Sequence, residues 1–381
     1  MQSFRISELV DKDLLVHGAL DLDRRPNGIS PRRLPAWTRP QVPAMLDVMV
    51  RMPSGVRLIF ETDSSAIAIT ALTTNMVTPP ASKRPVVFDL EIDDHIASSS
   101  NHAGNTIYLD SADRSKFELI RGGEGCWQFN NLGTEKKHCE IWLPQNAFVE
   151  LHDLRIDDGA SIAISTPGTP RWIHHGSSIS HCMEAEQPSQ IWPAVAARQS
   201  GAVLQNLGFG GQCHLDQFVA RTMRDSDADL ISIKTGINII NMDSMRERIF
   251  QPLLHGFLDT IREGKADTPI TLISPIYCPS AEDHPGPTIP DDNGKFIVVP
   301  GHREIREGSL TLSRVRQLIR EVVEIRDDEN LYYVDGLDLF AEADASDLPD
   351  DLHPNPGGYV RMGQRYAEKH LSAMVKKHSH D

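Results

Sequence analysis

The sequence predicts an α/β domain built on a parallel sheet, preceded by an all-β sandwich. In residues 1–165, short apolar or alternating runs are separated by Gly, Asn and Asp without a long helical period, which is typical of an antiparallel sandwich. From residue 171 onward, apolar strands alternate with helical stretches. This alternation requires crossover connections and hence a doubly wound parallel sheet with helices on both faces. The segment TPGTP at 166–170 has the proline and glycine content of a linker, so we expect domains at 1–165 and 171–381.

The individual elements follow from the same patterns. Strands of the sandwich are expected at 56–72, 85–92, 105–111, 116–120, 138–143 and 148–156. The second domain is expected to contain strands at 171–176, 202–208, 229–236, 268–276 and 331–336, and helices at 188–200, 214–224, 243–264, 309–326 and 357–376. Residues 277–308 contain five prolines and predict a long irregular connection, which is either a functional lid or a mobile insertion.

Composition excludes several classes of function. The 381 residues include 38 Lys and Arg against 53 Asp and Glu, and the net charge of −15 opposes binding to nucleic acid or to an anionic bilayer. No apolar window approaches the length of a membrane span, and the N-terminus lacks the pattern of a secretory signal, so we expect a cytoplasmic protein. Five scattered cysteines without a C-x-x-C pair indicate reduced, mostly structural thiols.

A candidate nucleophile lies in HHGSSISHC at 174–182. A predicted strand ends at Gly176 and runs into a serine and an expected helix. In open parallel sheets, ligands bind at the carboxyl ends of strands, so this junction would present a hydroxyl to the pocket. Ser178 is our candidate, although Ser177 or Ser180 fits on composition alone and an ordinary helix cap is the alternative. The nearby histidines have no carboxylate at a ligand spacing, so no metal site is expected.

A candidate base lies in DDLHPNPGGY at 350–359. Asp350 precedes His353 by three residues, and in a turn its carboxylate can bond the imidazole Nδ1 and leave Nε2 free to take a proton from serine. Asp351 is adjacent to Asp350 and is expected to point elsewhere. The alternative is an acidic turn that caps the last helix.

Two further motifs follow predicted strands. NLGFGG at 206–211 would bring the backbone N–H of Gly211 to the same edge of the sheet, and TGIN at 235–238 would bring the side-chain amide of Asn238 there. A backbone amide, an amide side chain and the amide of the nucleophile are the donors that an oxyanion hole needs. Each motif taken singly is an ordinary turn.

The order Ser, Gly, Asn and Asp-x-x-His over residues 170–376 resembles the SGNH hydrolases, also called the GDSL lipase/acylhydrolase family. The resemblance implies a flavodoxin-like sheet preceded by a jelly-roll-like sandwich. It also implies Ser178 as nucleophile, His353 as base, Asp350 as the residue that orients it, and Gly211, Asn238 and the Ser178 amide as the oxyanion hole.

The sequence departs from the family pattern at two places. Gly-Asp-Ser is replaced by Gly176–Ser177–Ser178, and Gly-x-Asn-Asp by Gly236–Ile237–Asn238–Ile239. Neither missing aspartate belongs to the implied triad. The Gly-Ser-Ser form, together with the stretch at 17–37, resembles a branch that includes polyketide-tailoring acyltransferases.

The predicted function is hydrolysis of a carboxylic ester, on a small molecule or an acylated sugar, through an acyl-serine and without a cofactor. The first alternative is an acyltransferase, in which a hydroxylated acceptor replaces water at the acyl-enzyme. The second is a catalytically dead carbohydrate-binding module, in which Trp37, Trp127 and Trp142 would stack on sugars; core or interdomain positions are the competing interpretation of these tryptophans. The sequence does not predict an oligomeric state.

Overall fold

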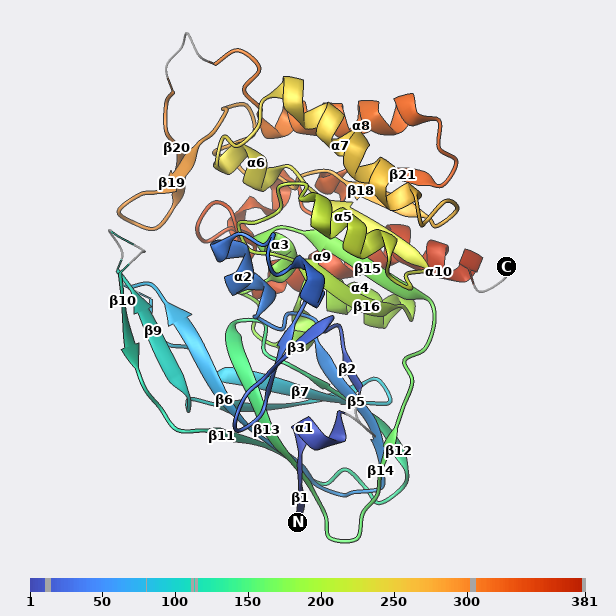
Figure 1. Ribbon diagram of the computed structural model, residues 1–381. Coiled ribbons are helices and arrows are strands. Elements are labelled where there is room, and N and C mark those ends of the chain that lie inside the picture. Colours follow the sequence, from blue (N-terminus) through green and yellow to red (C-terminus); the bar gives the residue numbers. More distant parts are fainter. Residues whose placement is uncertain (11–14, 80, 111–112, 114–115, 302–305, 379–381) are drawn as a thin grey trace. The chain divides into compact units, whose positions relative to one another are not determined.

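The computed structural model describes residues 1–10, 15–79, 81–110, 113, 116–301 and 306–378. The chain forms two compact units (Figure 1). Unit 1 comprises Met1–Arg39, Asp47–Pro167 and Glu186–Ser189, and unit 2 comprises Pro40–Leu46, Gly168–Ala185 and Gln190–Asp381. Independent domains with boundaries at 166–170 stay a prediction.

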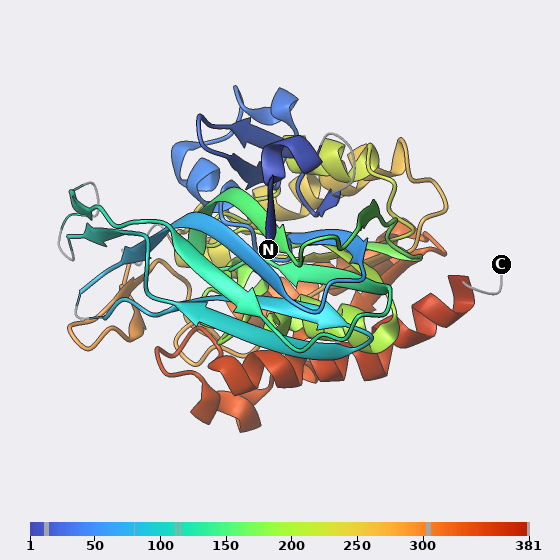
Figure 2. The ribbon, with the colours of Figure 1, turned by 90° about the horizontal axis from the view of Figure 1, so that it is seen from below.

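Unit 1 is a sandwich of two sheets, blue to green in Figures 1 and 2. Among the described residues, the larger sheet has eight strands: β10 (Phe117–Ile120), β9 (Asn105–Leu109), β6 (Ile67–Val77), β13 (Ala147–Ile156), β4 (Ile29–Arg32) and β3 (Asp21–Arg24), with β1 (Gln2–Arg5) beside β13 and β11 (Gly125–Phe129) beside β6. The smaller sheet has six: β14 (Ile162–Ile164), β5 (Arg57–Thr62), β12 (Lys137–Trp142), β7 (Val86–Ile92) and β8 (His95–Asn101), with β2 (Leu15–His17) beside β5. Two short helices, α1 (Ile6–Leu9) and α2 (Ala44–Val50), precede β5.

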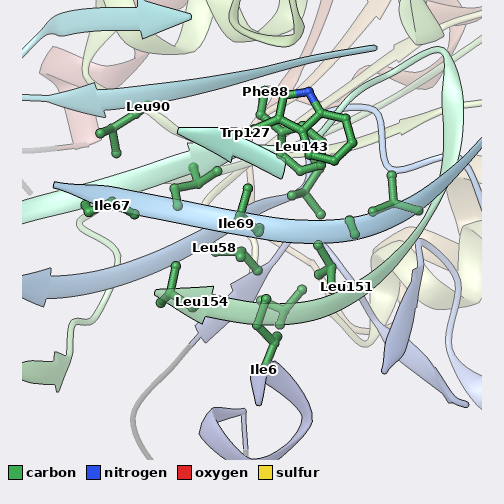
Figure 3. Close-up of a cluster of buried hydrophobic side chains, with 14 of the residues drawn as sticks. Ile6, Leu58, Ile67, Ile69, Phe88, Leu90, Trp127, Leu143, Leu151 and Leu154 are labelled. Carbon is green, nitrogen blue, oxygen red and sulfur yellow. The ribbon is translucent and has the colours of Figure 1, made fainter. Parts of the chain in front are cut away.

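The sandwich core consists of inward-facing apolar side chains (Figure 3). Phe88 and Trp127 both belong to it, with their ring centroids 4.5 Å apart. The indole N–H of Trp127 donates to the backbone oxygen of Val86 at 2.8 Å, which satisfies its polar group inside the core. Aliphatic side chains from both sheets complete the core, among them Leu58, Ile67, Ile69, Leu90, Leu151 and Leu154.

Unit 2 is a five-stranded parallel sheet in the order β16 (Val203–Gly208), β15 (Arg171–Gly176), β17 (Leu230–Lys234), β18 (Ile270–Ile273) and β21 (Leu331–Val334). Numbered along the chain, this order is 2-1-3-4-5, so the topological switch point lies at β15. The predicted α/β class, a helix-covered parallel sheet after a β-sandwich, is confirmed.

Helices cover both faces of this sheet (Figure 1). On one face, Trp172 of β15 contacts Trp192 of α4 (Trp192–Ser200) and Tyr366 of α9 (Pro356–Tyr366), with ring centroids 6.3 and 5.6 Å apart. On the other, His175 stacks on Phe257 of α7 (Glu247–Arg262). Side-chain hydrogen bonds join α7 to its neighbours α5 (Gln217–Arg224) and α8 (Leu312–Arg326). A π-helical turn (Ala367–Leu371) connects α9 to α10 (Ser372–His378), so the predicted last helix is one continuous rod, red in Figures 1 and 2.

The structure corrects the sequence-based elements in three respects. The strands β1 to β4, β8, β11 and β14 were not expected, and the strand region 56–72 is two strands, β5 and β6. The sandwich is not wholly antiparallel, because β6 and β9 pair in parallel. Residues 277–308 are not wholly irregular, because they contain an antiparallel hairpin of β19 (Thr288–Pro290) and β20 (Phe296–Val298). The polar sequence of β8, HIASSSN, explains why alternation could not reveal that strand.

Candidate active site

Ser178 lies at a sharp strand-to-helix turn at the switch point of the sheet. β15 ends at Gly176, and Ser178 is the first residue of the short helix α3 (Ser178–His181). Ser177 caps this helix, since its hydroxyl accepts a hydrogen bond from the N–H of Ile179 at 3.3 Å. A side chain at position 176 would collide with Ser180, so α3 can approach the strand this closely only because residue 176 is glycine.

Ser178, His353 and Asp350 form one hydrogen-bonded chain. The hydroxyl oxygen of Ser178 lies 2.9 Å from Nε2 of His353, and Nδ1 of His353 lies 2.7 Å from Oδ2 of Asp350. The other carboxylate oxygen of Asp350 accepts the backbone N–H groups of Leu352 and His353 at 3.0 and 2.6 Å. Asp350 therefore fixes both the turn and the imidazole that the turn carries. The catalytic roles of these residues stay a prediction.

The structure also shows where the alternative candidates, Ser177, Ser180 and Asp351, lie. Ser180 is buried, and its hydroxyl bonds Nε2 of His174 at 2.8 Å. Ser177 is buried as the helix cap. Asp351 points away from His353, and its carboxylate accepts hydrogen bonds from Lys295 at 3.0 and 3.2 Å. Ser178 and Asp350 are thus the serine and the aspartate that contact His353.

Opposing effects act on the pKa values of His353 and Asp350. Burial lowers the pKa of His353, but the charge of Glu184 and the hydrogen bond and charge of Asp350 raise it, and the net pKa lies above the ordinary 6.5. Burial raises the pKa of Asp350, but the hydrogen bond and charge of His353 and two backbone N–H groups lower it, and the net pKa is depressed. Asp350 is therefore a carboxylate at neutral pH, and His353 is a stronger base than a free imidazole.

The pKa of His353 predicts the pH dependence of catalysis. A general base works only when neutral, so activity falls as the pH drops through its pKa. Because that pKa is raised, we expect the acid limb of kcat/KM to have its midpoint above 6.5. Initial rates on p-nitrophenyl acetate from about pH 5 to 9 measure this limb. A midpoint clearly below 6.5 would contradict the assignment.

The two expected oxyanion donors lie just after the strands on either side of β15. Gly211 follows β16 and has φ +68°, a left-handed conformation that favours glycine. Asn238 lies in α6 (Ile237–Asn241), after β17, and its side-chain oxygen accepts the N–H of Cys213 at 3.0 Å. This bond fixes the side-chain amide and leaves its NH₂ group as a donor. Because β15 lies between β16 and β17, the carboxyl ends that carry Ser178, Gly211 and Asn238 are adjacent.

The histidines before Ser178 are structural. His174 and His175 are both fully buried, on opposite faces of the sheet. Burial lowers the pKa of His175 to about 4 and that of His174 well below 6.5, so both are neutral. Among the described residues, no cluster of three or more His, Cys, Asp or Glu could hold a metal ion. All five cysteines are free thiols, and every one except Cys126 is buried.

Sequence reasoning missed an aromatic residue that contacts His353. The ring of Phe296, on β20, lies edge-on to the imidazole with centroids 5.8 Å apart. Its backbone N–H donates to the carbonyl oxygen of Asp350 at 3.0 Å. The β19–β20 hairpin is thus attached to the histidine turn. No periodicity marks Phe296, because the hairpin strands are only three residues long.

Glu184 and Tyr359 were missed as well. The phenol of Tyr359, on α9, donates to Oε2 of Glu184 at 2.8 Å, and the charge of Glu184 acts on His353. Nothing in the spacing of an acidic residue six positions after Ser178 predicts this contact.

This chain has a parallel 2-1-3-4-5 sheet, a serine after the first strand of that sheet, and an Asp-x-x-His motif before the last helix. This combination is typical of SGNH-type hydrolases. Residues 175–361 match the GDSL-like Lipase/Acylhydrolase family. No curated protein sequence matches the chain.

Solved structures resemble the chain over nearly its whole length. The Salicylyl-Acyltransferase SsfX3 from a Tetracycline Biosynthetic Pathway is 27% identical, with a TM-score of 0.80 and 98% of each chain covered. A family two carbohydrate esterase from Cellvibrio japonicus is 12% identical, with a TM-score of 0.59 and 98% of each chain covered. One from Clostridium thermocellum is 14% identical, with a TM-score of 0.57, covering 96% of this chain and 98% of its own. The two esterases show likeness of fold alone.

None of the helices among the described residues is both long enough and apolar enough to cross a membrane. The expected cytoplasmic location stays a prediction.

Proposed function

We propose that the protein is a serine esterase that hydrolyses a carboxylic ester of a small molecule or an acylated sugar through an acyl-enzyme. One observation carries the proposal: the hydroxyl of Ser178 is 2.9 Å from Nε2 of His353, whose Nδ1 is held by Asp350 at 2.7 Å. A nucleophile, a base and a group that orients the base are the parts that covalent ester cleavage requires. The match of residues 175–361 to an acylhydrolase family supports the same chemistry.

The acylation step follows from this geometry. His353 takes the proton of Ser178 at Nε2 while the serine oxygen attacks the acyl carbonyl carbon. The carbonyl oxygen becomes an oxyanion, for which the N–H groups of Ser178 and Gly211 and the NH₂ of Asn238 are the proposed donors. The carbon–oxygen bond to the alcohol then breaks, and His353 gives its proton to the departing oxygen. Ser178 is left as an ester of the acyl group.

The deacylation step reverses these roles. His353 removes a proton from water, which attacks the acyl-serine, and the proton then passes to Ser178 as the carboxylic acid leaves. Asp350 keeps its negative charge throughout and stabilises the imidazolium in both steps. Its depressed pKa is consistent with this part of the proposal.

Loss of the Asn238 donor is expected to lower kcat by about 10² to 10³, or about 3 to 4 kcal/mol in the barrier, with little change in KM. Asn238→Ala removes the donor, and Asn238→Asp removes it while keeping the oxygen that accepts the N–H of Cys213. Steady-state kinetics of both variants measure the loss. Asn241→Ala, in the same helix, is the matched control. Wild-type kcat in both Asn238 variants would exclude Asn238 from the oxyanion hole.

The proposed activity is tested by turnover and by covalent labelling. Purified protein is assayed on p-nitrophenyl esters of increasing acyl length and on acetylated sugars, and is separately treated with a fluorescent fluorophosphonate. We expect turnover of at least one ester and labelling that heat denaturation abolishes. Folded protein that neither turns over an ester nor takes the label would contradict the proposal.

A second candidate is transfer of the acyl group to a hydroxylated acceptor. It is favoured by Phe296, whose apolar ring contacts the base that would activate water. The likeness to a salicylyl-acyltransferase, at a TM-score of 0.80 and 27% identity, supports this alternative. The two candidates share the acyl-serine and differ only in whether water or an alcohol attacks it.

Phe296→Ala is expected to lower the ratio of transfer to hydrolysis severalfold, because removing the ring admits water to His353. Partitioning of a preformed acyl-enzyme between water and added alcohols measures this ratio. The neighbouring Ile297 is exposed, so Ile297→Ala is the matched control. An unchanged ratio in Phe296→Ala would show that the ring does not govern access of water.

The alternative of a carbohydrate-binding module with a dead site loses its main support. Trp127, at 0% exposure, lies in the sandwich core, and Trp142 is 1% exposed, so neither can stack on a sugar. The indole N–H of Trp142 donates to Glu91 at 2.8 Å, and Arg57 lies over its ring. Trp37, at 41% exposure, is the member of this set that a ligand could reach.

A further inference from the structure

The segment after Ser178 and the segment after His353 are connected twice. The first connection is the Ser178–His353 hydrogen bond. The second lies six residues further along both segments, where the phenol of Tyr359 donates to Oε2 of Glu184 at 2.8 Å. A left-handed residue, Cys182 with φ 59°, ends α3 two residues before Glu184. The two bonds tie the segment that carries Glu184 to the segment that carries His353.

Tyr359 is suited to hold a carboxylate permanently. Its side chain is 0% exposed, on the first turn of α9. Burial, followed by the charge of Glu184, raises the pKa of the phenol well above its ordinary value. The phenol therefore remains protonated throughout the physiological range and keeps donating to Glu184. Glu184 itself is only half-buried.

Two carboxylates, those of Asp350 and Glu184, raise the pKa of His353. Asp350, in the same turn, contacts Nδ1, and Asp351 is paired with Lys295. Phe296, from the hairpin, brings an uncharged ring. Of the groups that raise the pKa of His353, the charge of Glu184 comes first, ahead of the hydrogen bond and the charge of Asp350. The imidazole thus lies in the field of two carboxylates from different segments.

We propose that Glu184, held by Tyr359, is a second acidic positioning residue that stabilises the imidazolium formed when Ser178 loses its proton to His353. The proposal rests on the proposed function. In the acylation step the proton moves from Ser178 to Nε2 and then to the departing alcohol oxygen, and Glu184 neither gains nor loses a proton. It acts by charge alone, whereas Asp350 also fixes the tautomer through Nδ1.

The test replaces the charge and keeps the shape. Glu184→Gln retains an oxygen that can accept the phenol hydrogen, so it isolates the effect of charge. We expect the acid limb of kcat/KM to move to lower pH by about one unit, because a lost negative charge makes His353 less basic. We also expect the rate on the pH plateau to fall about tenfold, since one pK unit of imidazolium stabilisation corresponds to that factor.

Two further variants provide controls. Glu184→Asp keeps the negative charge, so its acid limb of kcat/KM is expected to lie closer to that of the wild type than the limb of Glu184→Gln does. Glu186→Gln removes an exposed carboxylate two residues away and is expected to leave both the limb and the plateau unchanged. A lower plateau with an unmoved limb would mean that Glu184 only supports the structure, and it would overturn the proposal. Wild-type behaviour of Glu184→Gln would overturn it too.

A readout without turnover separates this proposal from the proposed function. The pKa of His353 in the full chain can be followed by NMR with labelled histidine, its resonance being assigned by its loss in His353→Gln. We expect a lower His353 pKa in Glu184→Gln than in the wild type, even if no tested ester is cleaved. An equal pKa in the two proteins would overturn the proposal, whether or not the wild type is an esterase.

Discussion

Ser178→Ala and His353→Ala are each expected to lower kcat for ester cleavage by between about 10⁴- and 10⁶-fold. The serine variant has no oxygen to form the acyl-enzyme, and the histidine variant leaves the hydroxyl, 2.9 Å away in the intact protein, without a base. Because the two groups act as a unit, the double variant should be little worse than either single variant. Pre-steady-state and steady-state rates on a p-nitrophenyl ester measure the three losses.

The controls for this prediction are a serine and a histidine outside the site. Ser372 and His378 lie in α10, and the variants Ser372→Ala and His378→Ala should keep wild-type rates. Circular dichroism and thermal melting verify that the site variants are folded. Single variants that retain wild-type rates, or a double variant whose loss is the product of the two single losses, would show that Ser178 and His353 do not act together.

Asp350→Asn is expected to lower kcat by about 10⁴-fold. The Asp350 carboxylate accepts Nδ1–H of His353 at 2.7 Å, which leaves Nε2 unprotonated toward Ser178. An amide can present its NH₂ group to Nδ1 and stabilise the opposite tautomer, in which Nε2 carries the proton and cannot act as a base. The acid limb of kcat/KM should also move to lower pH, since a negative charge near the imidazole is lost.

The adjacent residue provides the matched control for Asp350. Asp351 has the same chemistry one position away, but its carboxylate bonds Lys295 at 3.0 Å instead of His353. Asp351→Asn should therefore cause only a small change in kcat and no shift of the acid limb. A large loss of kcat in Asp351→Asn together with a small one in Asp350→Asn would show that Asp351, rather than Asp350, orients His353.

The fold of unit 2 could be predicted from the sequence because its signals are local. Each strand is an apolar run and each long helix has an amphipathic period, so β15 was expected at the residues where it lies, and α5, α7 and α8 lie within the predicted helices. Short strands of unit 1 gave weaker signals. β8 is polar and largely exposed, and β1 to β4 are three to four residues long, so no window could establish a period.

The parts of the site that could be predicted are those carried by short motifs. Ser178 follows a strand through glycine, and Asp350 has the fixed offset from His353 that a turn requires, so spacing alone selects them as candidates. Phe296, Glu184 and Tyr359 reach His353 or each other through tertiary packing. Their positions depend on how the hairpin, the end of α3 at Cys182 and α9 are arranged in space, which residue spacing does not encode.

Formation of the acyl-enzyme is the most direct test of this account. The protein is mixed with a slowly hydrolysed ester, quenched in acid within the first turnover, and examined by intact-mass and tandem mass spectrometry. We expect a mass increase equal to one acyl group, located on the Ser178 hydroxyl and missing in Ser178→Ala. Turnover without any adduct, or an adduct on another residue, would contradict the account.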